Sequence, residues 1–176
     1  MARVRKSQVQ SAFIKVVRKR TAQSVLMFVV LAAVYMVQLQ DRLFTGGTQV
    51  HDGDSLRIND QKFRIFGIDA PELDQTCTRN GASWPCGKAS RDYLTALIAK
   101  KEVVCEQKDT SYDRIVAICH AGGVDLAREM VRGGMAIALP QYSMLYVKDQ
   151  EKAKRNLEGI WSGKFMTPSR WRHKKK

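Results

Sequence analysis

The sequence predicts an α+β protein: a small closed β-barrel with about three helices packed against it, preceded by one N-terminal transmembrane helix. Five short apolar runs, separated by turn residues, have the length and composition of strands. A stretch with apolar residues at helical spacing lies between them, and later stretches are also helical, as is typical of helices packed on a barrel. An uncharged run near the N-terminus has the length of a membrane-spanning helix.

The N-terminal 40 residues divide into a basic and an uncharged half. Residues 1–20 contain seven Lys or Arg and no acid, and residues 21–40 contain no charged residue. The order predicts a basic cytoplasmic segment at 1–20 and a signal anchor at 21–40, with the rest on the periplasmic or extracellular side of a membrane. A signal peptide that is cleaved to release a secreted protein is the main alternative. A buried soluble helix is a weaker one.

The domain itself is predicted at residues 49–163, after a linker at 41–48. Its strands are recognised as short apolar runs between turn residues. The predicted strands are Gln49–Val50, Ser55–Ile58, Lys62–Ile68, Glu102–Gln107 and Ile115–His120, and Met135–Leu139 is a last strand.

Three stretches of the domain have helical character. Apolar residues recur at helical spacing from Lys88 onward, and Asp125–Arg132 and Lys148–Leu157 are two shorter helical stretches, each followed by glycine. The segment Leu73–Gly87 has no periodicity and several turn residues, so it is predicted as a loop.

The positive charge of the chain lies in its two ends. The net charge is +13, but of the 30 basic residues seven fall in 1–20 and six in 164–176, which leaves 17 basic residues against all 17 acids between them. The domain is formally neutral, so the charge of the whole chain says little about what the domain binds. The basic tail 164–176 ends in Trp171 and several cations. Such a tail is able to bind phosphates or an anionic membrane surface, but a disordered solubilising tail is the interpretation we favour.

Four cysteines follow the uncharged run: Cys77, Cys86, Cys105 and Cys119. An even number in an oxidising compartment predicts two disulfides, with three possible connectivities. Cys105 and Cys119 fall in two predicted strands joined by a short turn, which favours a cross-strand bridge, and Cys77 and Cys86 then close the loop between them. Unpaired buried cysteines are the alternative. Zinc is not indicated, because no C-x-x-C occurs and the histidines lack ligand spacing.

Three carboxylates and one arginine lie around two neighbouring predicted strands. Asp54 precedes the first strand, Arg64 lies in the second, and Asp69 and Glu72 follow it. A hairpin of these strands brings Asp54 and Asp69 to the same end, where two carboxylates form an oxygen site for a divalent cation. The arginine and the third carboxylate are the groups needed to bind a phosphate and activate a water. Taken singly, each residue is more often part of a turn or a solvated face.

Four motifs in this order resemble the thermonuclease (staphylococcal nuclease-like) family. The motifs are Asp52–Ser55, Arg64 with Gly67–Glu72, Tyr112–Ala117 and Gly159–Trp161. The resemblance runs from Val50 to Trp161 and leaves the N-terminal anchor outside it. It implies a five-stranded OB-fold barrel with packed helices and calcium-dependent cleavage of phosphodiester bonds in DNA and RNA, typically with 3′-phosphorylated products.

The resemblance implies a metal site and a general base. Asp54 and Asp69 match the family's calcium-binding carboxylates, and Ala70 matches the residue that offers its backbone carbonyl to the ion. Glu72 matches the proposed general base. Ca²⁺ is therefore the expected cofactor.

The resemblance also implies substrate-binding residues. Arg64 and Arg114 match the arginines that hold the scissile phosphate, and Tyr112 and Tyr142 match tyrosines that line the nucleotide pocket. Pro140 stands where a third, base-stacking tyrosine is expected, which leaves base preference open but does not affect the chemistry.

The sequence thus predicts an endonuclease acting on DNA or RNA, held at a membrane, with no protein partner predicted. A catalytically inactive module that binds single-stranded nucleic acid on the same barrel is the alternative. A membrane-anchored structural protein that merely binds calcium is a third hypothesis, and it leaves both arginines without a role.

Overall fold

The computed structural model of the chain describes residues 23–36 and 43–175. Residues 1–42 and 43–176 form two separate units. In the first, residues 23–36 form a helix whose side chains are exposed. Among the described residues, none of the helices combines the length and the apolar character needed to cross a bilayer. The predicted basic segment 1–20, and the ends of the predicted anchor at 21–40, lie outside the described residues.

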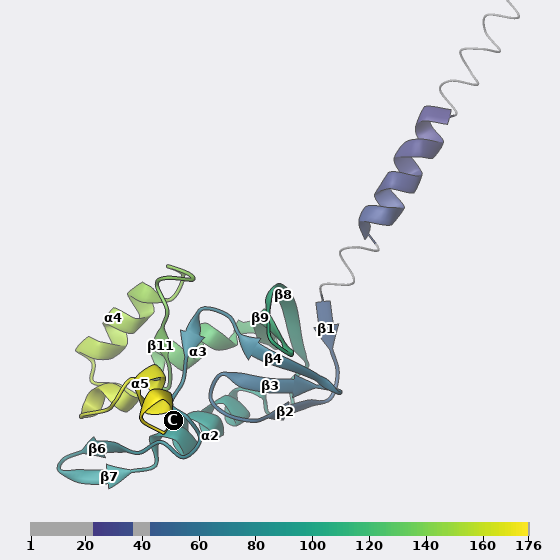
Figure 1. Cartoon of the computed structure of the whole chain (residues 1–176). Coiled ribbons are helices and arrows are strands. Elements are labelled where there is room, and N and C mark those ends of the chain that lie inside the picture. Colours follow the sequence, from purple (N-terminus) through teal and green to yellow (C-terminus); the bar gives the residue numbers. More distant parts are fainter. Residues whose placement is uncertain (1–22, 37–42, 176) are drawn as a thin grey trace, which may run out of the picture. The chain divides into compact units, whose positions relative to one another are not determined.

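The second unit is built on a curled mixed sheet (Figure 1). Its strands are hydrogen-bonded in the order β1-β8-β9-β4-β3-β2, with β10 added beside β9. The pairing of β4 with β9 is parallel and the other pairings are antiparallel. The paired strands form an open path that ends at β1 and β2, so the sheet is a curled half-barrel rather than the closed five-stranded barrel that we expected. The strands are β1 Leu43–Thr45, β2 Thr48–Val50, β3 Ser55–Ile58, β4 Gln61–Ile65, β8 Val103–Ser111, β9 Arg114–Ala121 and β10 Val124–Asp125.

Strand β1 lies where the sequence predicted a linker. Leu43–Thr45 pairs with β8, Leu43 opposite Glu106 and Thr45 opposite Val104. The prediction of a linker at 41–48 is therefore wrong for these residues. Phe44 explains the difference, because its ring packs edge-on against Phe63 with the centroids 5.0 Å apart and so joins the core.

The predicted strand Lys62–Ile68 is interrupted. Strand β4 ends at Ile65, a turn follows at residues 66–67, and β5 (Ile68–Asp69) pairs with β11 (Ile137–Ala138) in a separate two-stranded sheet. Gly67 has a φ of 77°, which an L-residue rarely adopts. This turn brings Asp69 back to within hydrogen-bonding distance of Arg64.

The segment predicted as a loop contains a small hairpin. Strands β6 (Cys77–Arg79) and β7 (Ala82–Trp84) pair across a turn at Asn80 and Gly81, both of which have positive φ. An Asn-Gly turn is a strong hairpin signal, and the prediction of a loop overlooked it. Helix α2 follows at Cys86, two residues before the predicted start.

The helices of this unit lie between and after its strands. They are α2 (Cys86–Ile98), α3 (Leu126–Arg132), α4 (Val147–Arg155), the 3-10 helix η1 (Gly159–Ser162) and α5 (Pro168–Lys174). Asp125 caps α3, as its side chain accepts a 3.1 Å hydrogen bond from the Arg128 backbone N–H. Helix α5 begins with a proline at its first position, where the missing N–H costs nothing. The interpretation of this tail as disordered is therefore wrong for residues 168–174.

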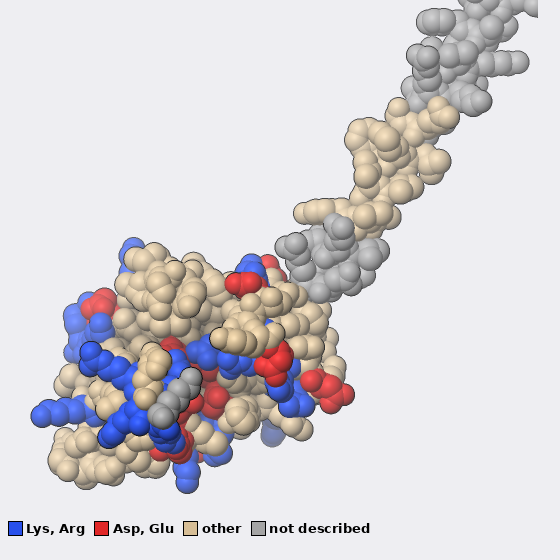
Figure 2. All heavy atoms as spheres, in the orientation of Figure 1, with Lys and Arg blue, Asp and Glu red and all other residues tan. Residues whose placement is uncertain are grey.

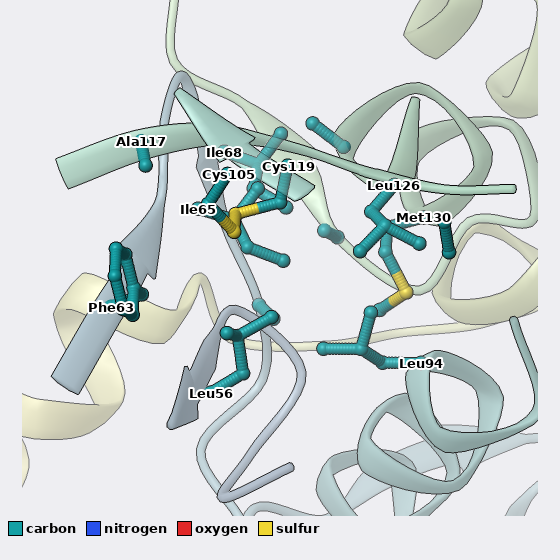
Figure 3. Packing of buried hydrophobic residues seen from close by; sticks show 14 of the residues in the cluster. Leu56, Phe63, Ile65, Ile68, Leu94, Cys105, Ala117, Cys119, Leu126 and Met130 are labelled. Carbon is teal, nitrogen blue, oxygen red and sulfur yellow. A yellow bond between two sulfur atoms is a disulfide. The ribbon is translucent and has the colours of Figure 1, made fainter. Parts of the chain in front are cut away.

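The main core lies between the sheet and helices α2 and α3. Figure 3 shows Leu56, Phe63 and Ile65 from the sheet on one side, with Leu94 and Met130 from the helices on the other. Each of these side chains is at most 2% exposed. Burial of such side chains is the main driving force for folding and fixes the sheet that carries the site described below.

Two disulfides link the four cysteines, and both predicted pairings are confirmed. Cys105 and Cys119 lie directly opposite each other on β8 and β9, inside the main core (Figure 3). Cys77 and Cys86 connect the β6–β7 hairpin to the start of α2. They belong to a second apolar cluster with Ile160.

Candidate active site

A cavity of about 630 Å³ opens beside the turn between β4 and β5. Its walls come from the β3–β5 region, β8, β9, the loop after β11 and helix α5. The predicted site residues that line it are Asp54, Arg64, Asp69, Ala70, Glu72, Arg114 and Tyr142. The structure therefore brings together residues from elements far apart in the chain.

Asp54 and Asp69 meet at the guanidinium of Arg64. Atom Nη2 of Arg64 lies 2.9 Å from Oδ2 of Asp54 and 2.7 Å from Oδ1 of Asp69. The two carboxylates are almost completely buried, at 4% and 2% exposed. Because one nitrogen lies within 3 Å of both, the two carboxylates are close enough to share a single cation.

The backbone around Asp54 fixes its carboxylate. Oδ1 accepts a hydrogen bond of 2.9 Å from the Ser55 hydroxyl, and Oδ2 accepts one of 3.1 Å from the Ala70 backbone N–H. Gly53 allows α2 to pack close behind this turn, since a Cβ there would lie 1.9 Å from Oγ of Ser90. Packing thus requires a glycine beside Asp54.

Burial changes the acidity of the Asp54 carboxylate. Desolvation raises the pKa of Asp54 from 3.8 to about 7, although the Arg64 guanidinium beside it acts in the opposite direction. Burial acts to lower the pKa of Arg64, but the charges of Asp54 and Asp69 outweigh it and raise that pKa overall. A divalent cation near Asp54 would favour its charged form, so proton and metal compete for this carboxylate.

The oxygen donors fit a hard cation. No group of three or more His, Cys, Asp or Glu side chains in a metal-binding arrangement occurs within the described residues. The predicted set instead offers two carboxylates, Asp54 and Asp69, with Ala70 beside them on the cavity wall. Ca²⁺ accepts oxygen ligands in flexible number and leaves the remaining positions to water and substrate, so these donors suit it.

Glu72 lies at the cavity wall on the loop after β5, with its side chain 31% exposed. Its backbone N–H donates to Oε1 of Gln75 at 3.2 Å, and its carbonyl accepts from the Gln75 N–H at 2.7 Å. Helix α2 approaches from behind at Gly87, where a Cβ would lie 1.7 Å from the Glu72 carbonyl oxygen. The loop is therefore fixed from two sides while the carboxylate remains accessible to water.

Arg172, on helix α5, also lies in the site, and our sequence analysis did not predict this. Its Nη1 is 2.6 Å from Oε1 of Glu72 and 3.0 Å from Oδ1 of Asp69, and its Nη2 is 3.1 Å from Oδ2 of Asp69. Burial acts to lower the pKa of Arg172, but its hydrogen bonds to Asp69 and Glu72 outweigh this and raise it. The proline that starts α5 is the signal that could have indicated a structured tail.

Of the three remaining predicted site residues, Arg114 and Tyr142 line the cavity and Tyr112 does not. Arg114 lies at the start of β9 and lines the cavity. Within the described residues it forms no salt bridge with the carboxylates of the cavity. Tyr142 is exposed and lines the cavity, in the loop that follows Pro140. Tyr112 is fully exposed at the β8–β9 turn and is not part of the cavity wall, so the structure does not bring it to the other site residues.

Comparisons with known proteins show which family the chain is similar to. A family model described as "Staphylococcal nuclease homologue" matches residues 62–163. The chain is 35% identical over 121 residues to the succinoglycan biosynthesis protein ExoI of Rhizobium meliloti (strain 1021), which covers 66% of this chain and 63% of that protein. It is 31% identical over 137 residues to an uncharacterized endonuclease of Haemophilus influenzae, which covers 73% of this chain and 72% of that protein. The chain therefore spans less than two thirds of the ExoI protein. The family match ends before α5.

Proposed function

Because the chain belongs to the staphylococcal nuclease homologue family, we propose that it is a calcium-dependent endonuclease that hydrolyses phosphodiester bonds of DNA or RNA. The observation that carries the proposal is the convergence of Asp54, Asp69, Glu72 and Arg64 on one cavity. These residues come from three different segments, and general packing of a barrel does not require three carboxylates to meet there.

Asp54, Asp69 and the Ala70 carbonyl are the residues that would hold the calcium ion. When bound, the ion supplies positive charge that stabilises the phosphate oxygens as the bond is cleaved. Both carboxylates are buried. Asp54 accepts hydrogen bonds from the Ser55 hydroxyl and the Ala70 N–H, and Asp69 accepts one from Arg64, so their oxygens are already oriented.

Glu72 is the proposed general base. Its carboxylate is partly exposed at the cavity wall, so a water molecule has access to it. Glu72 takes a proton from this water, whose oxygen attacks the phosphorus. The bond between the phosphorus and the leaving ester oxygen breaks, and that oxygen takes up a proton from solvent. Fixation of its backbone by Gln75 and by α2 keeps the carboxylate in place.

Two arginines from different strands hold the phosphate in this proposal. Arg64 comes from β4 and Arg114 from β9, and both line the cavity. A guanidinium presents two parallel N–H donors to a phosphate, and the favourable charge interaction grows as negative charge develops on the oxygens. Tyr142, exposed at the same cavity, is placed to contact a nucleotide. A contact of Tyr112 with nucleic acid stays a prediction.

The test is an incubation of the full chain, purified in mild detergent, with single-stranded DNA and with RNA in the presence of calcium. Cleavage should occur and should stop when a chelator removes the metal. Binding without calcium-stimulated cleavage would instead support the alternative, an inactive module that holds single-stranded nucleic acid.

Export of the nuclease domain across a membrane is a second part of the proposal. Two disulfides support it, because such bonds form and persist in oxidising compartments and are rare in the cytosol. Residues 21–40 contain no charge and follow a basic segment, which supports an N-terminal anchor with the domain outside. Protease added to intact spheroplasts should digest the domain, and protection of the domain would contradict export. N-terminal sequencing of the mature chain separates an anchor from a cleaved signal peptide.

A further inference from the structure

Helix α5 is held against the site by contacts from several parts of the chain. The segment before it pairs with β6 through two backbone hydrogen bonds between Thr78 and Lys164, of 2.8 and 2.9 Å. The buried Gln75 side chain donates to the Met166 carbonyl at 2.7 Å. On the helix itself, the indole of Trp171 donates to Asp74 at 3.3 Å, and Lys175 also pairs with Asp74. The position of α5 is thus specified by the fold.

The helix is strongly basic and lies at the edge of the cavity. Residues 164–176 contain six Lys or Arg and no acid. Figure 2 shows Lys and Arg side chains gathered over the part of the surface where α5 lies. Of the basic side chains of α5, only Arg172 lines the cavity among the residues that the structure describes. Arg172 is 39% exposed, so it is accessible to a molecule that enters from solvent.

Arg172 binds the same carboxylate oxygens that a metal ion would use. Asp69 Oδ1 accepts hydrogen bonds from Arg64 and Arg172, and Asp69 Oδ2 accepts a second one from Arg172. A divalent cation on Asp69 would repel a guanidinium this close and would take over the neutralisation of the carboxylate. Arg172 would then lose its contacts with Asp69, which leaves Nη2 free to donate to a phosphate while Nη1 keeps its partner Glu72.

Resting on the nuclease function proposed above, we propose that Arg172 is a third phosphate-binding arginine of the site, supplied by the C-terminal helix. In the metal-free protein it neutralises Asp69 and Glu72. With metal bound it binds a phosphate of the nucleic acid beside Arg64 and Arg114. The family match covers residues 62–163, so Arg172 lies outside the matched segment.

The charge of the cavity supports this role. The acidic residues that line it, Asp52, Asp54, Asp69, Glu72 and Asp109, carry up to five negative charges, and Arg64 and Arg114 supply two positive ones. With a calcium ion the charge of these groups is still about −1, which opposes the binding of a phosphate. Arg172 brings the charge to about zero and gives a phosphate of the polynucleotide a cationic partner.

The experiment compares the full chain with R172Q and R172K and uses R170Q as the control. Arg170 lies on the same helix, is exposed and does not line the cavity. Calcium binding is measured by titration calorimetry without nucleic acid. Because R172Q removes a competing cation and its three charge-assisted hydrogen bonds, two of them to Asp69, it should bind calcium more tightly, on the order of tenfold.

The second measurement is the cleavage of single-stranded DNA at saturating calcium. R172Q should raise KM on the order of tenfold with a smaller change in kcat, since a phosphate contact is lost. R172K should restore part of the loss, and R170Q should change neither KM nor calcium affinity. An unchanged KM in R172Q overturns the phosphate role, and an unchanged calcium affinity overturns the metal-free role.

Failure of the nuclease proposal can be told apart from failure of the Arg172 proposal. If the wild-type chain cleaves nothing, the nuclease proposal fails. The wild type and the variants are then compared by the Kd with which they bind a fluorescent DNA oligonucleotide at saturating calcium. A Kd weakened by R172Q and not by R170Q supports Arg172 as a phosphate ligand. Equal Kd values for wild type and R172Q overturn it.

Discussion

The side chain of Gln75 donates a 2.7 Å hydrogen bond to the backbone carbonyl of Met166, 91 residues further along the chain. The same amide accepts a hydrogen bond from the Glu72 N–H through Oε1. Gln75 is 1% exposed. One buried amide therefore connects the loop of the proposed base to the segment that leads into α5.

Replacement of Gln75 by leucine should destabilise the protein. The variant leaves the Glu72 N–H and the Met166 carbonyl without their partner, and an unsatisfied buried polar group costs about 1–3 kcal/mol. Urea unfolding measures the loss. Q49L, at an exposed position on β2, is the matched control and should change stability little. Equal unfolding midpoints for the two variants would contradict this role of Gln75.

Replacement of Glu72 by glutamine should abolish most turnover and preserve calcium binding. Loss of a general base lowers kcat by about 100-fold or more. Asp54 and Asp69 are unchanged in this variant, so calcium affinity should remain within a few fold by calorimetry. E102Q, outside the cavity, is the control. If E72Q cleaves DNA at the wild-type rate, the nuclease proposal stands but the base has been assigned to the wrong residue.

Replacement of either phosphate-binding arginine by lysine should be damaging although the charge is kept. Lysine lacks the planar fork that matches a phosphate, so R64K and R114K should each lower kcat/KM by about tenfold or more. R64K should also alter calcium affinity, because Arg64 contacts both metal carboxylates and Arg114 contacts neither. R57K, exposed on β3, serves as the control. Wild-type kinetics in both variants would exclude bidentate recognition by these residues.

The stability of the metal-free protein should depend on pH through Asp54. Its pKa is raised from 3.8 to about 7 in the folded state. An acid whose pKa is higher in the folded than in the unfolded state makes its full contribution to stability at pH below its unfolded-state pKa. This contribution is lost as the pH rises through its folded-state pKa. In a chelator, the free energy of unfolding should therefore decline between about pH 4 and pH 7.

Two variants isolate this effect. D54N should remove the part of the decline that comes from this group, and D60N, in the exposed turn after β3, should retain it. Saturating calcium should also reduce the decline, because the ion favours the charged carboxylate. A chelated D54N protein with the wild-type pH profile would show that another group is responsible.

The parts of the fold that were predicted correctly are marked by patterns of neighbouring residues in the sequence. Strands β3 and β4 contain apolar residues on either side of a turn, and the Cys105–Cys119 bridge was predicted from two strands of the same kind. The meeting of Asp54 and Arg64 followed from the same hairpin, whereas Asp69 reaches them through the turn at Gly67, which the sequence analysis did not predict.

The contribution of the C-terminal helix had only one weak local signal, the proline at its start. Helix α5 has seven residues, which is too short to be stable by itself. Its position depends on Thr78, Gln75 and Asp74, which lie about 90 residues away and leave no mark on the tail's own sequence. Tertiary contacts of this kind are not visible in periodicity or composition, so Arg172 could be found only from the structure.

The ion pair between Arg172 and Asp69 joins residues 103 positions apart. Contacts between distant parts of a chain form slowly, because the entropy of loop closure opposes them until neighbouring structure is in place. We therefore expect the site to assemble after the β8–β9 hairpin during folding. Pulse-labelled hydrogen exchange should protect the amides of β8 and β9 before those of α5, and simultaneous protection would contradict this order. A chain with a folded sheet would then pass through a stage at which its catalytic groups are not yet assembled.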